Sequence, residues 1–276
     1  MLGFHIKEWA DRAAYPWYFL RGRRPWMPGY YTARKRAIEQ ALDRGLFHNG
    51  ELPTGYGAHM DERVVEYPWV YRQLPEEPGR MLDAGSALNY EFLLQRDPVA
   101  RAKLTICTLA PEKRCYYYRA ISYVFDDLRH TMFRDQCFDT IVSISTIEHV
   151  GLDNTRLYTH DASKAETRPD DYRSVVREFR RLLKPGGVCL ITVPFGRARV
   201  RGWFQVFDQT MVQDVLDHFG PQQSRVDYFA YGKEGWTRSC PECLTDVEFY
   251  DVHQDGPPPP DGAAGARAVA CMRLEV

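Results

Sequence analysis

The stretch Arg80-Met-Leu-Asp-Ala-Gly-Ser-Ala-Leu-Asn-Tyr90 decides the fold of this chain. It contains a short apolar strand, an acidic residue and a turn of small residues that opens toward a helix. A turn of this kind brings backbone N–H groups to the point where a ligand can sit, and it favours anionic groups. The turn has a single glycine, Gly85, so its value as evidence depends on the motifs that follow it.

The composition is that of a globular α/β protein. The chain has 276 residues, of which 44% are hydrophobic and 26% are charged, and this length suits one α/β domain with additions. A net charge of −1 disfavours a generally basic nucleic-acid binder. The N-terminus lacks the pattern of a signal peptide, and no window reaches the apolar length of a membrane span. These features predict a cytoplasmic protein.

The seven cysteines are scattered, mostly within apolar runs, which is typical of reduced thiols. Cys240-Pro-Glu-Cys243 has zinc-ligand spacing, but a tetrahedral site needs four ligands and no second pair follows. We therefore expect free thiols in a loop.

From Arg80 onward the pattern alternates between strand and helix, as parallel crossover units require. A helix over 170–183 has one apolar stripe, and Asp208 is positioned to cap a further helix. Two earlier helices are expected over 32–46 and 61–74. The expected strands are 80–83, 103–108, 120–125, 140–145, 188–193, 225–231 and 266–274.

We divide the chain into a helical N-terminal extension, residues 1–78, and a main domain, residues 79–276, with an irregular insert at 232–265. Residues 1–40 carry eight Lys or Arg against three acidic residues, interleaved with Trp and Tyr. One interpretation is that these aromatic side chains pack on the main domain. The other is that they contact a membrane surface, an anionic substrate or a partner protein.

Four stretches in one order resemble the class I S-adenosylmethionine-dependent methyltransferases. The stretches are Leu-Asp-Ala-Gly-Ser-Ala at 82–87, Phe-Asp-Asp-Leu-Arg at 125–129, Cys-Phe-Asp-Thr-Ile-Val-Ser-Ile-Ser-Thr-Ile-Glu-His-Val-Gly at 137–151, and Leu-Lys-Pro-Gly-Gly-Val-Cys-Leu-Ile-Thr-Val-Pro-Phe-Gly at 183–196. The order and spacing are more specific than any one motif. The first stretch also resembles a narrower bacterial group with a Leu-Asp-Ala-Gly-Ser-x-Leu-Asn signature, often found among glycan-assembly enzymes.

The resemblance implies an α/β fold with a Rossmann-like, seven-stranded, mostly parallel sheet that ends in an antiparallel hairpin. It also implies S-adenosyl-L-methionine as cofactor, bound at the carboxyl ends of the first strands. Transferred to this sequence, Asp127 would accept from the adenine amino group, and Leu128 would donate its backbone N–H. Ser145 would offer its carbonyl to the cofactor's ammonium group. Around the methionine part the resemblance places Asp83, Gly85, Ser86 and Ala87.

One departure from the family concerns the ribose. The second strand of the family usually ends in a carboxylate that holds both ribose hydroxyls, and Thr108 occupies this place. A threonine hydroxyl offers one such bond without charge assistance. Glu112, one helical turn further on, is the nearest substitute.

Candidate catalytic residues cluster just beyond the fourth strand. Methyl transfer to a hydroxyl requires the hydroxyl to lose its proton, and an imidazole with a pKa near neutrality suits that task. We expect His149 to be the base, with Glu148 and Asp153 beside it. The alternative is that Glu148 and His149 only cap the following helix and line the cofactor wall.

A divalent metal is a less favoured alternative. Related methyltransferases bind one through Glu-x-x-Glu-His, whereas this chain has Ser145-x-x-Glu148-His149. Asp153 or His160 would have to complete the site. We therefore assign no metal ligand.

Further residues could shape an acceptor pocket. Tyr158 and His160 lie in a polar loop before the 170–183 helix, and Arg197 and Trp203 follow the fifth strand. Arginine beside aromatic rings suits a sugar, an aromatic acid or a phosphate.

The sequence thus predicts a methyltransferase that acts on a hydroxyl of a small molecule, carbohydrate or glycan precursor, without nucleic acid as partner. The competing hypothesis is a methyltransferase-like scaffold that has lost activity, and Thr108 and the single-glycine turn are its support.

Overall fold

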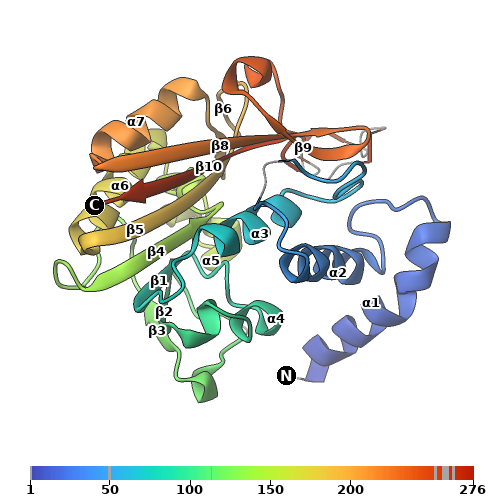
Figure 1. Ribbon diagram of the computed structural model, residues 1–276, viewed down its shortest axis with the longest axis horizontal. Helices are drawn as coiled ribbons and strands as arrows, with labels where there is room; N and C mark the ends of the chain where they lie inside the picture. Colours follow the sequence, from blue (N-terminus) through green and yellow to red (C-terminus); the bar gives the residue numbers. More distant parts are fainter. Residues whose placement is uncertain (1, 49–50, 113, 252–253, 257–260, 263–264) are drawn as a thin grey trace.

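The computed structural model describes residues 2–48, 51–112, 114–251, 254–256, 261–262 and 265–276, and Figure 1 shows their arrangement. A mostly parallel sheet with strand order β3-β2-β1-β4-β5-β10-β8-β9 forms the centre. The strands are β1 (Arg80–Ala84), β2 (Lys103–Thr108), β3 (Ser122–Phe125), β4 (Phe138–Ile144), β5 (Leu183–Pro194), β8 (Gln223–Gly232), β9 (Gly235–Ser239) and β10 (Ala268–Glu275). The strands β6 (Arg199–Val200) and β7 (Gln205–Val206) form a separate ribbon.

The α/β fold class is confirmed, and the strand count differs by one from the expectation. The first five strands pair in parallel, whereas β10 runs antiparallel between β5 and β8. The eighth strand, β9, pairs antiparallel with β8 at the sheet edge. It lies inside the insert 232–265 that we expected to be irregular. A short connection after Gly232 lets the chain fold back as a hairpin, because Gly235 has a φ of 97°.

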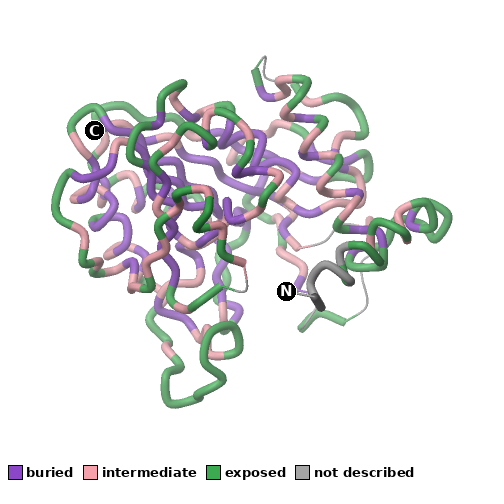
Figure 2. Tube along the Cα trace, turned by 90° about the horizontal axis from the view of Figure 1, so that it is seen from below, coloured by how far each residue is buried: buried purple, intermediate pink, exposed green. Residues whose placement is uncertain are grey.

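Helices cover both faces of the sheet. The helices α3 (Arg63–Gln73) and α4 (Glu91–Leu94) share one apolar cluster, and α6 (Tyr172–Leu182) and α7 (Gln209–Phe219) share the other. Successive residues of a strand serve opposite clusters, as Met81 and Leu82 do, because side chains alternate across a sheet. Figure 2 shows this buried core at the centre of the molecule.

The N-terminal segment adds α1 (Leu2–Leu20) and α2 (Tyr30–Asp43) beside the sheet (Figure 1). The Asp11 carboxylate accepts from the N–H of Gly29, the N–H of Thr32 and the Thr32 hydroxyl, each at 2.7 Å, so one side chain holds α1 against the start of α2. No helix of the described residues is both long enough and apolar enough to cross a membrane.

Helix α3 belongs to the N-terminal extension but packs into the main core. Its cluster includes Trp69 of α3 together with Leu104 of β2 and Phe229 of β8. Pro68 lies inside the helix and cannot bond the carbonyl of Val64 one turn earlier. The Tyr56 hydroxyl donates to that carbonyl instead, which satisfies the bond that the proline removes.

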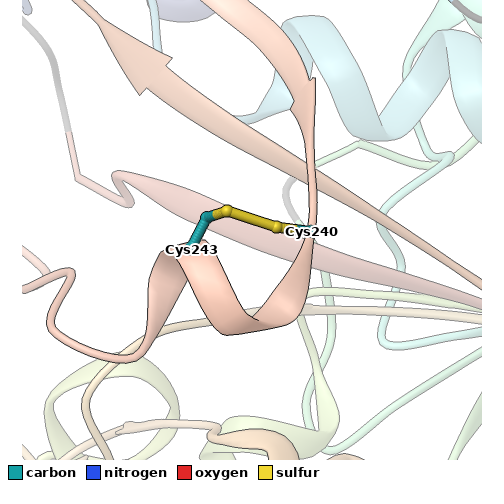
Figure 3. Close-up of a disulfide and its surroundings, with 2 residues drawn as sticks. All are labelled: Cys240 and Cys243. Atoms are coloured by element: carbon teal, nitrogen blue, oxygen red, sulfur yellow. A yellow bond between two sulfur atoms is a disulfide. The ribbon is translucent and has the colours of Figure 1, made fainter.

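The expectation of free thiols at Cys240 and Cys243 is wrong. The two side chains form a disulfide in the structure, across the single turn η6 (Pro241–Leu244) that follows β9 (Figure 3). One turn of 3₁₀ helix brings their Cα atoms to 5.4 Å, which is within the range that a disulfide spans. Of the rest of the insert, residues 252–253, 257–260 and 263–264 lie outside the described part of the chain.

Replacement of Trp69 by Ala should destabilise the whole protein. The Trp69 side chain is fully buried, and its Nε1 donates to Asp227 Oδ2 at 2.9 Å. We expect the free energy of unfolding to fall by about 3–5 kcal/mol in urea denaturation. The control, Trp9→Ala on α1, removes a side chain that is 73% exposed and should change this free energy by less than about 0.5 kcal/mol. Similar losses in both variants would contradict the shared core.

Candidate functional site

The candidate site is a pocket at the carboxyl ends of four neighbouring strands, and we call it the strand-end pocket. Its volume is about 590 Å³, which is within the usual range for small-molecule sites. It lies where the strand order reverses between β1 and β4, the point at which open α/β sheets bind ligands. Each of these strands contributes a lining residue at its carboxyl end: Gly85 after β1, Thr108 of β2, Asp127 after β3 and Ser145 after β4.

The turn after β1 is held by the strands around it. Gly85 donates its N–H to the carbonyl of Cys107 at 2.8 Å and has a φ of 109°. A Cβ at this position would lie 2.1 Å from Thr146 Oγ1. Gly85 is therefore required by the close approach of Thr146, in addition to any approach of a ligand.

Asp83, at the end of β1, holds the turn after this strand through hydrogen bonds to its backbone. Its buried carboxylate accepts from the N–H of Ala87 at 3.2 Å and from the N–H of Leu88 at 2.9 Å, and it does not line the strand-end pocket. Burial raises the pKa of Asp83 to about 7, even though both backbone bonds lower it. Ser86 is buried with a φ of 64°, and its hydroxyl has no hydrogen-bond partner among the described residues.

Asp127 reaches the pocket with its carboxylate already bound to Arg129. The Arg129 guanidinium donates to both carboxylate oxygens at 2.6–3.0 Å. Burial acts to raise the pKa of Asp127, but the bonds and charge of Arg129 lower it below its usual value. Arg129 also pairs with Glu166 at 2.9 Å and with Asp171 at 2.6 Å. This one cation therefore ties the β3 end to the loop on the far side of the pocket.

Thr108, at the position where the resemblance leads us to expect the ribose, lines the pocket together with Tyr158. The Thr108 side chain is buried at 3% exposure, and the Tyr158 hydroxyl lies near it without the geometry of a hydrogen bond. Burial raises the pKa of Tyr158, so the phenol stays protonated at neutral pH. Glu112, the suggested substitute acid, is exposed and does not line the pocket.

Ser145 is anchored by an acid from α3. Glu66 is fully buried, and its Oε1 accepts from Ser145 Oγ at 2.6 Å and from Thr192 Oγ1 at 2.7 Å. Its Oε2 pairs with Arg63 at 2.5 Å. Ser145 has a φ of 41°, a strained left-handed conformation that these bonds help to hold. The N-terminal extension thus takes part in building the pocket.

His149 lines the pocket in one defined tautomer. Its Nδ1 lies 2.9 Å from the carbonyl oxygen of Trp203, so Nδ1 carries the hydrogen and Nε2 keeps a free lone pair. Burial lowers the pKa of His149 to about 4, and the Trp203 bond opposes this only in part. The near-neutral pKa expected from the sequence is therefore wrong, because the ring is packed against Trp203 with centroids 5.0 Å apart. The imidazole is neutral at physiological pH.

Glu148 points into the core rather than into the pocket. It is 2% exposed, its Oε2 has no hydrogen-bond partner among the described residues, and its Oε1 lies 3.9 Å from His149 Nε2. Burial raises the pKa of Glu148 well above its usual value, and Glu66 nearby adds to this. Burial therefore favours the neutral form of this side chain.

Eight predicted site residues do not line the pocket: Asp83, Ser86, Ala87, Glu148, Asp153, His160, Arg197 and Trp203. The Asp153 carboxylate accepts from the N–H and hydroxyl of Thr155, where it fixes the start of α5 (Thr155–Tyr158). His160 is exposed, and Arg197 is exposed in ion pairs with Asp246 and Glu248. Trp203 acts through its carbonyl and ring on His149. No group of three or more His, Cys, Asp or Glu side chains is arranged for a metal ion within the described residues.

Several residues of the site were missed from the sequence. Glu66 is far from its partners in the chain, Arg129 is the last residue of the second motif, and Thr146 lies inside the third motif. The Arg at the end of Phe-Asp-Asp-Leu-Arg was a usable signal for Arg129, since it stands two residues from Asp127. Glu66 carried no local signal.

The residues present fit an adenosine-type cofactor. Asp127 and Leu128 lie on one side of the pocket and Gly85 and Ser145 on another, and the buried hydroxyls of Ser86 and Thr108 lack hydrogen-bond partners within the described residues. Such buried hydroxyls are normally satisfied, so they mark positions where a polar ligand would be bound.

Residues 100–191, about a third of the chain, match a family model described as "Methyltransferase domain". No curated protein sequence matches the chain. Among solved structures, a 1,6-didemethyltoxoflavin N1-methyltransferase of Burkholderia thailandensis with bound S-adenosylhomocysteine is 14% identical, with a TM-score of 0.44 and coverage of 91% of each chain.

Two further structures give similar values. An S-adenosylmethionine-dependent methyltransferase of Thermotoga maritima is 13% identical with a TM-score of 0.46, covering 87% of this chain and 97% of that one. The cyclase SpnF is 14% identical with a TM-score of 0.38. The match covers 70% of this chain and 59% of the SpnF chain, so the present chain spans less than two thirds of that protein. The family match identifies residues 100–191 as similar to a methyltransferase domain and supports the transferase class.

Proposed function

We propose that this protein transfers a methyl group from S-adenosylmethionine to a hydroxyl of a small molecule, carbohydrate or glycan precursor. The observation that carries this proposal is the neutral, tautomer-defined His149 on the wall of the strand-end pocket. S-adenosylmethionine, when bound, supplies the methyl group on a sulfonium. The chain's own residues have to bind, orient and deprotonate the acceptor.

The pocket residues divide among three parts of the cofactor. Leu128 and Asp127 suit the adenine, and Thr108 with Tyr158 suits the ribose. Ser145 and the turn at Gly85–Ala87 suit the methionine part. Because Arg129 already occupies both oxygens of Asp127, the bond to the adenine amino group has to be shared with that guanidinium.

The geometry supports a base role for His149. The Trp203 carbonyl holds Nδ1–H, so Nε2 is the nitrogen that accepts a proton from the acceptor. With a pKa of about 4 the ring is always unprotonated at pH 6–8 but is a weak base. This suits a reaction in which proton removal accompanies methyl transfer rather than precedes it.

Binding of S-adenosylhomocysteine tests the proposal against the inactive-scaffold hypothesis. We expect measurable affinity by calorimetry in the wild type. Thr108→Asp should tighten binding about tenfold, since a carboxylate would add charge-assisted bonds to the ribose. Thr108→Asn introduces a side chain of the same size as aspartate but without the charge, and it should not tighten binding of S-adenosylhomocysteine. Absence of wild-type affinity would favour the scaffold.

Replacement of His149 by Ala should lower turnover about 100-fold or more and leave S-adenosylhomocysteine affinity nearly intact, because loss of a general base affects the chemical step. The measurement is incorporation of labelled methyl groups into a panel of sugars and sugar phosphates. His218→Ala, on α7, is the control. Since the pKa of His149 is about 4, its protonation should cause no fall in wild-type turnover between pH 8 and pH 6. Unchanged turnover in His149→Ala would limit the residue to the wall of the pocket.

We further propose that α1 contacts an anionic membrane surface. Trp9, Trp17 and Leu20 are 73%, 59% and 77% exposed, and Arg12 and Arg21 are exposed on the same helix or directly after it. Exposed aromatic side chains with arginines suit a lipid interface.

Cosedimentation with phosphatidylglycerol vesicles tests this contact. We expect binding that Trp9→Ala/Trp17→Ala weakens severalfold, because the apolar area available for insertion falls. Phosphatidylcholine vesicles are the neutral control and should bind less. Recovery of the wild type and of Trp9→Ala/Trp17→Ala in the supernatant in equal amounts would contradict the proposal.

A further inference from the structure

A second pocket lies between the N-terminal helices and the loop after β1, and we call it the basic pocket. Its volume is about 550 Å³, and none of its lining residues lines the strand-end pocket. The lining comes from α1, α2, α3, Tyr90 and Phe92 at the start of α4, and Arg114 after β2, so segments far apart in the sequence build it.

The charge of the basic pocket is strongly positive. Its lining includes six cationic and two acidic side chains: Lys7, Arg12, Arg34, Lys35, Arg36 and Arg114 against Asp11 and Glu39. Asp11 is occupied by the backbone N–H groups of Gly29 and Thr32. The Lys35–Glu39 pair is long, at 4.0 Å, and so neutralises little. Arg34 is paired with Asp61 outside the lining, so five other cations face two acids, and this excess favours an anionic ligand.

Aromatic rings lie among these cations. Tyr31 is 51% exposed, and Tyr90 and Phe92 line the same pocket. The Arg114 guanidinium lies 4.8 Å from the centre of the Tyr90 ring, and Lys35 Nζ lies 5.3 Å from that of Phe92. Rings that stack on a sugar or base, beside cations that bind phosphate, are the two elements needed to recognise a ring compound with a phosphate group.

The basic pocket shares a wall with the turn of the strand-end pocket. Tyr67 lines the basic pocket, and its hydroxyl donates to the carbonyl of Ala87 at 2.9 Å. On the other side, Asn89 Nδ2 donates to the carbonyl of Arg114 at 3.1 Å. Side chains of the basic pocket are thus bonded directly to the turn on which the methionine part of the cofactor is expected.

We propose that the basic pocket binds the phosphate-bearing part of the acceptor, a sugar or nucleoside phosphate. The assignment of this ligand as the acceptor rests on the proposed methyltransferase function, whereas the phosphate site itself rests on the charges and rings described above. Phosphate can come from a soluble ester or from a lipid headgroup, and only the soluble ring compounds offer a partner for Tyr90 and Phe92.

Titration calorimetry with UDP-glucose, glucose 1-phosphate, inorganic phosphate and glucose tests the site in the full chain. We expect UDP-glucose to bind most tightly and glucose without phosphate not to bind. Arg12→Gln/Lys35→Gln should weaken binding of UDP-glucose at least tenfold, because two charged contacts are removed from the lining. The matched control, Arg177→Gln/Lys233→Gln, removes two exposed cations outside the pocket and should leave binding unchanged.

S-adenosylhomocysteine titrated into the same proteins separates this inference from the proposed function. Its affinity should be the same in Arg12→Gln/Lys35→Gln as in the wild type. Binding of S-adenosylhomocysteine without binding of any phosphate compound would overturn the basic pocket and leave the proposed function. Binding of UDP-glucose without S-adenosylhomocysteine would overturn the acceptor assignment together with the proposed function.

A lipid arm completes the test. The same double variant is compared with the wild type on phosphatidylglycerol vesicles, which carry phosphate without a ring. Since α1 is itself expected to bind these vesicles, the ligand class that we assign would be overturned by vesicle binding that the double variant abolishes, together with no binding of UDP-glucose by the wild type. Equal binding of UDP-glucose by the wild type and the double variant would also overturn it.

Discussion

The structure depends on the buried carboxylate of Glu66. One oxygen accepts from the hydroxyls of Ser145 and Thr192, at the carboxyl ends of β4 and β5, and the other pairs with Arg63. A charge removed from water costs several kcal/mol unless it is bonded in this way. These bonds fix α3 on the ends of β4 and β5, and Ser145 at the end of β4 lines the pocket. The helical extension is therefore part of the site.

A second, partly buried cluster of ion pairs lies at the end of β3. Arg129 joins Asp127 to Glu166 and Asp171, so the end of β3 and the loop before α6 are held at one cation. Ion pairs of Glu66 and Arg129 therefore hold the segments on two sides of the strand-end pocket in place. His149 then stands on the wall with its orientation set by a backbone carbonyl, and neither Glu148 nor Asp153 is needed to hold it.

The sequence predicted the sheet well because strand burial and helix periodicity are local signals. Asp208 caps α7 as expected, with its side chain accepting from the N–H of Met211. Gly85, Thr108, Asp127, Ser145 and His149 gather as predicted, since parallel strands end at one edge of a sheet. Side-chain partners could not be predicted: Asp153 bonds Thr155, and Arg197 pairs with acids about fifty positions away. The anchor of Ser145 lies 79 residues upstream, beyond any spacing rule.

Adjacent residues of α3 serve two different cavities. Glu66 bonds the strand end that bears Ser145, whereas Tyr67 bonds the turn at Ala87 and faces the basic pocket. A small axial rotation of this one helix would therefore alter both cavities at once. If binding of one ligand rotates the helix and so changes the affinity for the other, thermodynamic reciprocity requires the second ligand to change the affinity for the first by the same factor. Helix α3 would in this way couple the two proposed binding equilibria.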